Sequence, residues 1–580
     1  MHESRKRAAS AAGRMRNRMR PAARTAPWGS DPFPATGAVA QRSLAAIVFL
    51  LVAALYLGAL TPIALTDPDE VFYSQTAREM IDQHTLLTPV LFGHPQFEKP
   101  PLLYWCLIGS FRIFGMSPFA ARLVPVSFGA FGIIATFLFC RRLFGEKAAG
   151  ISAVLLGTSG LYLVMSDIVL TDIALTALMA AALYCFYLWF LERADSHLYG
   201  FATAAALAVL TKGPVALVIV VSTAVIFLAL QKDLAAIRRF LVHPWVLLFA
   251  ALSMPWYAYA WAKYGRAFID EFIVRDNWDR ILYAEHPRND HWWFYPAILF
   301  FGLFPWTSYL VLIGRRWKEF RSAHVFFAVW FAVTFLVFQI AHSKLPSYVL
   351  PAFPALIIPA GLALSSWEGR SRRGTALSFV HGFFGVALCV LPSFPRLTEY
   401  GPYVWHAAVF ALRLMGVLVI VASVALWRGK VLQAVAVEAA GVVLLALLIA
   451  LSIPESVDRA TTSRYVADIV AREGYEGQPV VTTKQLARGI HFYTGNPVVV
   501  LHPVKQPWWS PHPVEVLTTN EEITRYFASR SRVICVLQRS SIEELQRLFN
   551  GKRLSRVVAR DGGKIVLVSE KIAMPGAQQE

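Results

Sequence analysis

Three carboxylates lie within four positions of "LTDPDEVFYSQTAREM" (65–80), directly after a long apolar run: Asp67, Asp69 and Glu70. Closely spaced carboxylates can act as a general base, orient a substrate or bind a cation. They can also begin a helix, with Asp67 as the N-cap, Pro68 at the first helical position and Glu70 completing a capping box. A further acid in the first turn adds only about 0.3–1 kcal/mol through the helix dipole. Capping therefore explains Asp67 and Glu70, and it leaves Asp69 as the candidate for chemistry.

The residues after these acids predict a helix with one apolar face, of the kind that lies at a membrane interface. Its members share helical spacing: Phe72, Tyr73, Thr76, Ala77, Met80 and Ile81.

A second acidic motif, "FGHPQFEKPPLLYW" (92–105), places Glu98 and Lys99 before a double proline. One interpretation is a pair of interfacial charges with Tyr104 and Trp105 as aromatic anchors. The other is a carboxylate that binds a hard cation or orients a substrate, next to an ammonium group that binds a phosphate.

A third motif, "MSDIVLTDIAL" (165–175), has Asp167 and Asp172 at a turn between two apolar runs. It reads either as a polar turn or as part of a site, because an acid at the edge of hydrocarbon is costly. Residues five apart do not share one helix face, so we expect only one of the two acids to face a site.

Cationic residues gather in three further segments. "TKGP" (211–214) offers Lys212, and "AHSKLPSYVLP" (341–351) offers Lys344 together with Tyr348. Each lysine alone is an ordinary snorkelling residue. An aromatic loop, 274–296, adds Arg275, Arg280, His286, Arg288 and His291. Together on one face, these cations would bind an anionic phosphate head group, with carboxylates nearby for chemistry.

The elements that must position these residues are membrane-spanning helices. The chain has 580 residues, of which 56% are hydrophobic and 16% charged, with a mean hydropathy of +0.49, which is too apolar for a soluble protein of this size. The net charge of +18 reflects topology rather than nucleic-acid binding, because Lys and Arg fall mainly in the N-terminal tail and in short gaps between apolar runs. Five cysteines without close spacing indicate neither a disulfide framework nor a zinc cluster: Cys106, Cys140, Cys185, Cys389 and Cys535.

Apolar runs predict about 13 spans, if a short run at 199–211 is included. Residues 1–43 read as a basic cytoplasmic tail, and the run after them is long enough to span and lacks a clean cleavage site. Apart from 199–211, the apolar runs lie near 44–65, which is the run after the tail, and near 118–140, 148–166, 172–192, 213–231, 242–262, 293–313, 323–341, 347–366, 375–392, 406–427 and 431–453.

Orientation follows from the bias of Lys and Arg toward the cytoplasm. With the tail inside and 199–211 counted as a span, five Lys- and Arg-rich loops also fall inside: 141–147, 231–239, 315–321, 368–373 and 427–430. The segments that carry the candidate residues fall outside: 66–117, 166–172, 263–292 and 341–348. We therefore expect one site on the extracytoplasmic face, assembled from several loops.

After Ile453 the composition becomes that of a soluble protein. Four β-branched runs alternate with helix-like stretches, which predicts a small α/β domain over 454–580 on the outer side. The runs are 478–483, 496–501, 532–537 and 564–569. The predicted domains are thus the tail (1–43), a transmembrane domain (44–453) and this soluble domain.

Five motifs occur in an order that resembles membrane glycosyltransferases of the aminoarabinose transferase type: "DPDEVFYSQTAREM", "FEKPPLLYW", "LTKGPVAL", "H…WWFYPAILFFGLFPW" and "SKLPSYVLP". These proteins belong to the glycosyltransferase-C superfamily and are related more distantly to protein O-mannosyltransferases. The resemblance covers about 45–366, with a weaker echo in "HFYTGNPV" (491–498).

The resemblance implies an α-helical polytopic protein with the glycosyltransferase-C fold and a small extracytoplasmic α/β domain. It implies an enzyme of the bacterial inner membrane, active on the periplasmic face, that transfers a sugar from an undecaprenyl or other polyprenyl phosphate to lipid A or another cell-envelope glycolipid. In the best-known members the sugar is aminoarabinose. We expect a monomer that has lipids, but no nucleic acid, as partners.

Residue roles also follow from the resemblance. The catalytic acids are Asp69, Glu70 and Asp172. Glu98 matches a metal ligand together with His286, although the spacing leaves His291 open, and the expected ion is zinc or magnesium. With the loop cations included, the substrate-binding residues are Lys99, Lys212, Tyr348, Lys344 and Arg275.

The chain departs from the family at one point. Members usually have Arg and Tyr after Asp-Glu and one spacer, whereas Phe72 and Tyr73 follow here, so one cation is missing. This departure weakens the prediction of lipid A as the substrate and leaves the reaction type intact. In that reaction an acceptor oxygen attacks the anomeric carbon, and cations stabilise the leaving phosphate. No nucleotide sugar is required, and the sequence has no Gly-rich phosphate loop.

Two other functions compete with this prediction. A lipid-linked sugar flippase should carry ionisable residues near the membrane midplane, whereas the polar residues here cluster at one edge. A protein O-mannosyltransferase shares the early acidic motif but has a larger loop domain.

Overall fold

The structure is a computed structural model. It describes residues 50, 52–53, 63–314, 318–367, 372–390, 402–452, 455–501, 514–538, 541–543, 545 and 556–570. The predicted tail at 1–43 and most of the predicted first span at 44–65 lie outside the described residues.

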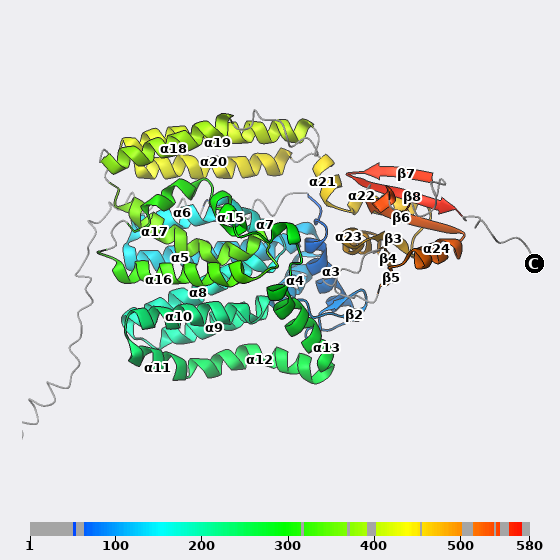
Figure 1. Cartoon of the computed structure of the whole chain (residues 1–580), viewed down its shortest axis with the longest axis horizontal. Helices are drawn as coiled ribbons and strands as arrows, with labels where there is room; N and C mark the ends of the chain where they lie inside the picture. Colours follow the sequence, from blue (N-terminus) through cyan, green and yellow to red (C-terminus); the bar gives the residue numbers. More distant parts are fainter. Residues whose placement is uncertain are drawn as a thin grey trace, which may run out of the picture.

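Helices make up one long region of the molecule, stacked side by side (Figure 1). One outer layer contains α18, α19 and α20, and the opposite layer contains α9 to α12. The helices are α4 (Leu102–Phe114), α5 (Pro118–Phe144), α6 (Glu146–Gly157), α7 (Gly160–Asp167), α8 (Thr171–Glu192), α9 (Ser196–Lys212), α10 (Val215–Leu230), α11 (Leu234–Val242), α12 (Trp245–Tyr264), α15 (Phe294–Gly302), α16 (Arg321–Ile340), α17 (Phe353–Ser365), α18 (Arg372–Val390), α19 (Pro402–Trp427) and α20 (Val431–Ser452).

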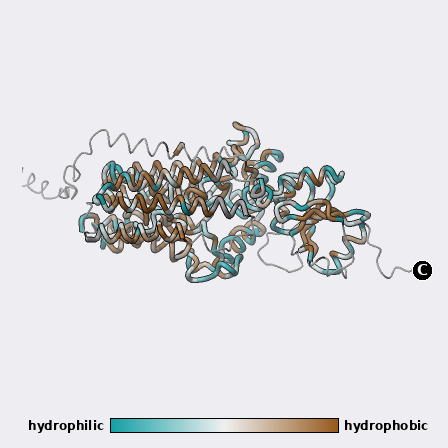
Figure 2. The backbone as a smooth tube through the Cα atoms, turned by 90° about the horizontal axis from the view of Figure 1, so that it is seen from above, coloured by the Kyte–Doolittle hydropathy of each residue, from teal (hydrophilic) through white to brown (hydrophobic). Residues whose placement is uncertain are grey.

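Seven helices in the described part of the chain are long and apolar enough to cross a membrane, or up to nine if each of two bent pairs is one span. The protein is therefore polytopic, while the predicted number of about 13 spans is not established. The short run at 199–211 is helical in α9, a helix of 17 residues that packs between α8 and α12. Apolar residues run through this region, and hydrophilic residues gather at its ends (Figure 2).

Two predicted spans are bent rather than straight. α6 and α7 meet at 63°, where the hydroxyl groups of Thr158 and Ser159 donate to the carbonyl oxygens of Val154 and Leu155. Such side-chain bonds back to the helix loosen its backbone ladder. α15 and the short helix η3 (Trp306–Leu312) meet at 105° beside Pro305, which restricts the residue before it.

The first acidic motif forms α3 (Asp69–Asp82), and its predicted helix start is wrong in detail. Pro68 is the N-cap, and no side chain caps the helix. Glu70 instead accepts hydrogen bonds from the backbone and hydroxyl of Thr66, at 3.0 and 2.9 Å. Nor does α3 lie on a surface as an interfacial helix, because it is buried on most sides between the helical region and α23 (Lys484–Thr494).

Between α3 and α4 the chain forms a short antiparallel pair, β1 (Val90–Leu91) and β2 (His94–Pro95). Short helices connect the remaining parts: α13 (Arg266–Phe268), the π-helix η1 (Ile269–Asp279), α14 (Arg280–Leu282), η2 (Pro287–Asn289), η4 (Pro346–Ala352) and α21 (Glu455–Thr461).

The C-terminal part contains a six-stranded sheet in the order β5-β4-β3-β6-β8-β7. Its first four strands are parallel, and β8 runs antiparallel to both neighbours. The four β-branched runs noted in the sequence form β3, β4, β6 and β8. The elements are α22 (Arg464–Arg472), β3 (Val480–Thr483), β4 (Val498–Leu501), β5 (Glu515–Leu517), α24 (Asn520–Ala528), β6 (Arg532–Gln538), β7 (Arg556–Asp561) and β8 (Lys564–Glu570).

Side-chain alternation along these strands gives the sheet two apolar faces. Val480 packs with α22 and α23 on one face, whereas Val481 packs with α24 on the other. α23 therefore lies between the sheet and α3, where the C-terminal part meets the helical region (Figure 1).

Candidate active site

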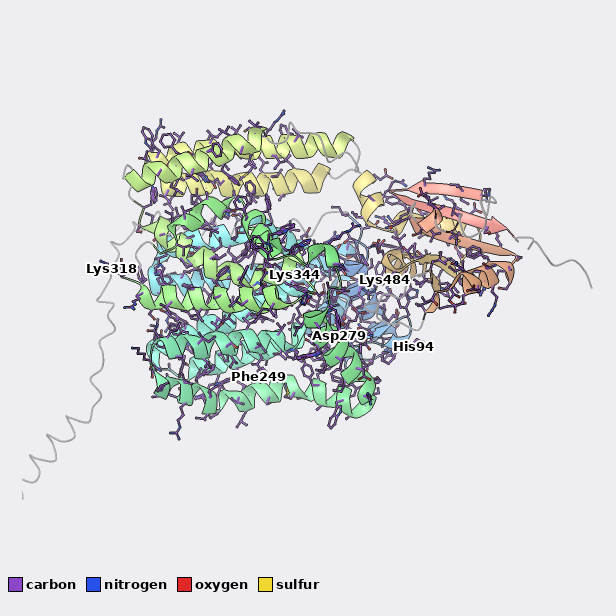
Figure 3. All side chains as sticks on the ribbon, in the orientation of Figure 1. His94, Phe249, Asp279, Lys318, Lys344 and Lys484 are labelled. Carbon is purple, nitrogen blue, oxygen red and sulfur yellow. The ribbon has the colours of Figure 1, made fainter. Side chains whose placement is uncertain are left out.

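The candidate residues gather at one end of the helical region. Asp279 and Lys484 lie toward the C-terminal sheet and Lys344 lies further inward in the same half of the helical region, whereas Lys318, from a predicted cytoplasmic loop, lies at the opposite end (Figure 3). The prediction of one site built from several loops thus agrees with this arrangement.

An apolar cluster brings the site segments together. Phe97, Leu210 and Phe272 are buried in one cluster although they come from the loop before α4, from α9 and from η1. Phe97 directly precedes Glu98, and Leu210 lies two residues before Lys212. Packing of these apolar side chains therefore fixes the polar residues beside them.

Lys212, Asp172 and Tyr348 form the first part of the site. The Lys212 Nζ donates to Asp172 Oδ1 at 2.5 Å and lies 3.9 Å from the centre of the Tyr348 ring. The Tyr348 hydroxyl accepts a hydrogen bond from Arg280 at 2.9 Å. The structure thus joins three predicted site residues to a loop arginine.

Lys99 joins the same network through Asp276. Its Nζ lies 3.1 Å from Asp276 Oδ2, and Arg280 lies 3.8 Å from Asp276 Oδ1. Arg280 also lies 3.3 Å from Glu285. These links place Lys99, Lys212 and Arg280 in one continuous charged network, which we call the cation network.

The sequence did not single out Asp276 or Glu285. Asp276 is carried by the π-helix η1, a helix type that is rare and often found at functional sites. One signal was the density of charges in "VRDNWDR" (274–280), where Arg and Asp alternate at helical spacing.

Helix α23 of the C-terminal part adds two cations that the sequence did not predict. Arg488 lies 2.8 Å from Glu98 Oε1, and its guanidinium carbon lies 4.1 Å from the centre of the Phe72 ring. Lys484, one turn earlier, interacts electrostatically with Glu98 and Glu285, and burial lowers its pKa. The weak signal was their spacing of four residues just before the "HFYTGNPV" echo.

Asp69 is surrounded by these charges while it remains accessible from solvent. Burial among protein atoms raises the pKa of its carboxyl group, and the charge of Arg488 opposes this rise. Further increases come from Glu98, Asp172 and Glu285. Asp69 therefore lies close to both other acidic motifs, and their negative charge favours the protonated form of its carboxyl group.

Glu70 has contacts outside the cation network, and its assignment to the catalytic residues stays a prediction. Its side chain is buried and forms an ion pair of 2.8 Å with Arg122, a residue that the sequence did not indicate. It also accepts from the backbone of Val169 at 3.1 Å. Its contacts tie α3 to α5 and to the turn before α8, which is a structural role.

Asp167 and Asp172 face different surroundings, as their spacing predicted. Asp172 belongs to the cation network, whereas Asp167 interacts electrostatically with Arg122 and Glu70.

Two predicted cations have other partners. Lys344 pairs with Asp290 at 2.5 Å, beside His342 at 2.7 Å from the same carboxylate. Arg275 pairs with Glu271 at 2.9 Å and reaches Asp276 only at 4.0 Å. Arg275 thus borders the cation network, while Lys344 forms a neighbouring cluster.

The predicted metal ligands do not converge. Glu98 pairs with Arg488, His286 is exposed, and the alternative His291 stacks on Trp293 with ring centres 5.2 Å apart. Within the described ranges, no group of three His, Cys, Asp or Glu side chains could hold a metal ion. These residues do not fit a metal site, so the metal stays a prediction and no reaction step is assigned to it.

An ionisable cluster also lies away from the site, among the outer helices. His381 of α18 lies 2.8 Å from Glu438 of α20, and both side chains are fully buried. Ser308 and Tyr309 of η3 contact the same pair, at 2.6 Å from His381 and 2.9 Å from Glu438. The expectation that polar residues cluster only at one edge is therefore wrong, because a single acid in a long apolar run escaped notice.

Comparison with known proteins gives this site a context. Residues 98–259 match the family described as dolichyl-phosphate-mannose-protein mannosyltransferase. A protein of unassigned function from Aquifex aeolicus is 30% identical over 308 residues, 52% of this chain and 69% of the relative. The undecaprenyl phosphate-alpha-4-amino-4-deoxy-L-arabinose arabinosyl transferase of Pseudomonas aeruginosa is 28% identical over 457 residues, 74% of this chain and 80% of that one.

The fold agrees with these sequence matches. The crystal structure of ArnT from Cupriavidus metallidurans bound to undecaprenyl phosphate superposes with a TM-score of 0.75 at 22% identity, and the match covers 91% of this chain and 98% of that chain. The chain belongs to the glycosyltransferase-C superfamily and is similar to its aminoarabinose transferases.

Within this superfamily, the chain spans 66% and 62% of the length of two other curated relatives that it matches. Three of the motifs that suggested the aminoarabinose transferase type supply the cation network, because they contain Lys99, Lys212 and Tyr348. Arg280 and Asp276 come from outside these motifs and complete the network.

Proposed function

We propose that this protein transfers a sugar from a polyprenyl phosphate, such as undecaprenyl phosphate, to an acceptor on the periplasmic face of the inner membrane. Lipid A or another cell-envelope glycolipid is the proposed acceptor. The observation that carries the proposal is the cation network beside Asp69: Lys99, Lys212 and Arg280 lie in one network, next to the carboxylate that remains solvent-accessible.

The network suits a phosphate leaving group. When the bond between the anomeric carbon and the phosphate oxygen breaks, the electron pair stays on the lipid phosphate, which gains negative charge. A Lys ammonium has three donors and an Arg guanidinium five. Lys212 and Arg280 are held by Asp172 and Tyr348, so little reorganisation is needed when this charge develops.

Asp69 suits the role of general base. In the forward step, the acceptor oxygen bonds to the anomeric carbon and its proton, where the acceptor is a hydroxyl, passes to the Asp69 carboxylate. An ionised phosphate acceptor carries no such proton, and Asp69 would then orient it. A carboxylate close to Arg488 and accessible from solvent fits both uses.

The decisive experiment is sugar transfer by the purified protein. Polyprenyl phosphates carrying radiolabelled aminoarabinose, mannose or another sugar are incubated with the protein and a membrane extract, and the labelled acceptor is identified. Label in lipid A supports the proposed acceptor, whereas label in another glycan or in protein replaces it.

The control variant is Asp69→Asn, which keeps the shape of the side chain and removes its basicity. We expect normal membrane insertion and a rate reduced by about 10²- to 10⁴-fold, the usual contribution of a general base. Full transfer by this variant would refute the role of Asp69. The absence of transfer by the unmodified protein with every donor would refute the function itself.

A further inference from the structure

Arg488 brings the C-terminal part of the chain into the active site. It belongs to α23, 390 residues after Glu98, yet its guanidinium lies 2.8 Å from Glu98 and 4.1 Å from the Phe72 ring centre. Both partners are anchored, since Phe72 is buried and Glu98 follows the buried Phe97. The guanidinium is therefore held from two directions.

This geometry suits arginine in particular. A guanidinium is planar, so one edge can bond a carboxylate while its face stacks on an aromatic ring. Lysine could provide the charge but not both contacts at once. The two contacts together orient the Glu98 carboxylate and place a positive charge near Asp69.

The positive charge of Arg488 comes from α23, and the residue of α3 at this contact, Phe72, is apolar. Phe72 follows Asp69 on the first turn of α3, and its apolar side chain brings no charge to the acids. Glu98, Asp172 and Glu285 lie near Asp69 and raise its pKa, and the charge of Arg488 opposes this rise. Like charges at short range destabilise one another, and Arg488 is the cation that pairs directly with Glu98 among them.

We propose that Arg488 is a positioning residue of the active site, supplied by the C-terminal α/β part, that holds Glu98 against α3 and provides beside Asp69 the positive charge that Phe72 does not. This inference rests on the proposed function. It assigns the C-terminal part a direct share in the site.

A second contact between α3 and α23 offers a matched control. Arg78 donates to the backbone oxygen of Phe492 at 3.1 Å, and its guanidinium carbon lies 4.2 Å from the Phe492 ring centre. This contact also stacks a guanidinium on a phenyl ring across the same helix pair, and the acids beside Arg78 are Glu79 and Asp82 rather than those of the site. Arg78→Gln therefore tests whether looser packing of α23 is enough to impair the enzyme.

The experiment compares Arg488→Gln, Arg488→Lys and Arg78→Gln in the full-length protein, with kcat and KM measured per folded enzyme. We expect Arg488→Gln to lower kcat roughly 10- to 100-fold, the usual effect of losing a group that orients active-site side chains. Arg488→Lys should recover part of this loss, and Arg78→Gln should leave kcat unchanged. Equal kcat for the two Gln variants would overturn the proposal.

An exchange of the two side chains tests the charge itself. In the double variant Phe72→Arg with Arg488→Phe, α3 carries the cation and α23 carries the aromatic ring of the same contact. Recovery of kcat above that of Arg488→Gln supports the proposal. A folded exchange variant that is no more active than Arg488→Gln contradicts it.

A measurement without substrate keeps the proposal independent of the proposed function. A double-mutant cycle with Glu98→Gln and Arg488→Gln, read by thermal unfolding in detergent, gives the coupling between the two residues. Non-additive shifts in the melting temperature are expected, and additive shifts would overturn the proposal even if the exchange variant does not fold. Failure of sugar transfer by the unmodified protein would refute the function while this cycle still decides the role of Arg488.

Discussion

The carboxylate of Asp67 occupies the space that a side chain at Gly489 would need. A Cβ atom at Gly489 would overlap with Asp67 Oδ1, so the glycine allows α23 to approach the start of α3. Asp67 Oδ2 accepts a hydrogen bond from Ser463, and the Asp67 backbone N–H donates to Thr461 at 2.9 Å. The residue that sequence reasoning assigned to helix capping therefore joins the C-terminal part to the helical region.

Replacing Gly489 by Ala should displace α23. The added methyl group forces Asp67 or the helix to move, at a cost of about 1–3 kcal/mol for overpacking. Because Arg488 adjoins Gly489, we expect a lower melting temperature together with a reduced rate of sugar transfer. Gln485→Ala on the exposed side of the same helix is the control, and equal behaviour of the two variants would contradict this role of Gly489.

Asp67 should make stability depend on pH. Burial raises the pKa of its carboxyl group from 3.8 to about 7, although the bond from Ser463 opposes the rise. A raised folded-state pKa means that folding favours the protonated form, so this contribution is complete below the unfolded pKa and is lost as the pH rises through about 7.

Asp67→Asn removes the titration and keeps an acceptor for Ser463. Melting curves between about pH 5 and about pH 8 should therefore show a larger fall in the melting temperature for the unmodified protein than for the variant. An identical pH dependence for the two proteins would show that Asp67 does not titrate in this range.

Lys212 and Lys344 should differ in importance, although the sequence placed both in the substrate site. Lys212→Met removes a cation from the network around Tyr348, and we expect kcat to fall about 10²- to 10³-fold, as when one donor to a developing oxyanion is lost. Lys344→Met changes only the cluster with Asp290. Comparable losses of kcat for the two variants would show that the site extends to Lys344.

The Lys212 variant also leaves Asp172 buried without its partner. Adding Asp172→Asn should restore the melting temperature but not the rate, since it removes the unpaired charge without replacing the cation. Recovery of the rate would mean that Lys212 acts only on stability.

The pH dependence of transfer should report Asp69. If the ionised carboxylate is the base, the rate falls as the pH drops through its pKa, which lies above the ordinary value. Glu98→Gln removes a negative charge and should move this fall to lower pH. Arg488→Gln removes a positive charge and should move it to higher pH. Shifts in the same direction for both variants would exclude an electrostatic effect on Asp69.

The buried pair of His381 and Glu438 should contribute to stability rather than to transfer. Removing one partner, as in His381→Leu, leaves Glu438 buried with the Tyr309 hydroxyl but without its ion-pair partner, which costs about 3–5 kcal/mol. The double variant His381→Leu with Glu438→Leu should melt close to the unmodified protein. A loss of transfer in that stable double variant would instead indicate a functional role.

Several features of this protein follow from local sequence alone. Apolar runs predicted most of the helices, because a segment in the membrane must satisfy its backbone groups internally. The β-branched runs 480–483 and 498–501 form parallel strands. Motif order indicated four residues of the site, which lie close to the ends of predicted spans: Lys99, Lys212, Tyr348 and Asp172.

Other features depend on contacts between distant segments. The acids of "DPDE" look alike in sequence, yet Asp67 contacts the C-terminal part, Glu70 pairs with Arg122, and Asp69 lies beside the cation network. Local spacing cannot report such partners, because a capping box and an ion pair use the same residue types.

Arg488 shows the same division between sequence and tertiary structure. As a sequence position it is one cation on an amphipathic helix of a soluble segment, a place where charge usually faces water. Only the packing of α23 on α3, allowed by Gly489, brings it to Glu98 and Phe72. The sequence by itself therefore determined the membrane helices and the chemical type of the site, whereas tertiary packing decided which charges meet there, since ion pairs depend on distance in space and not along the chain.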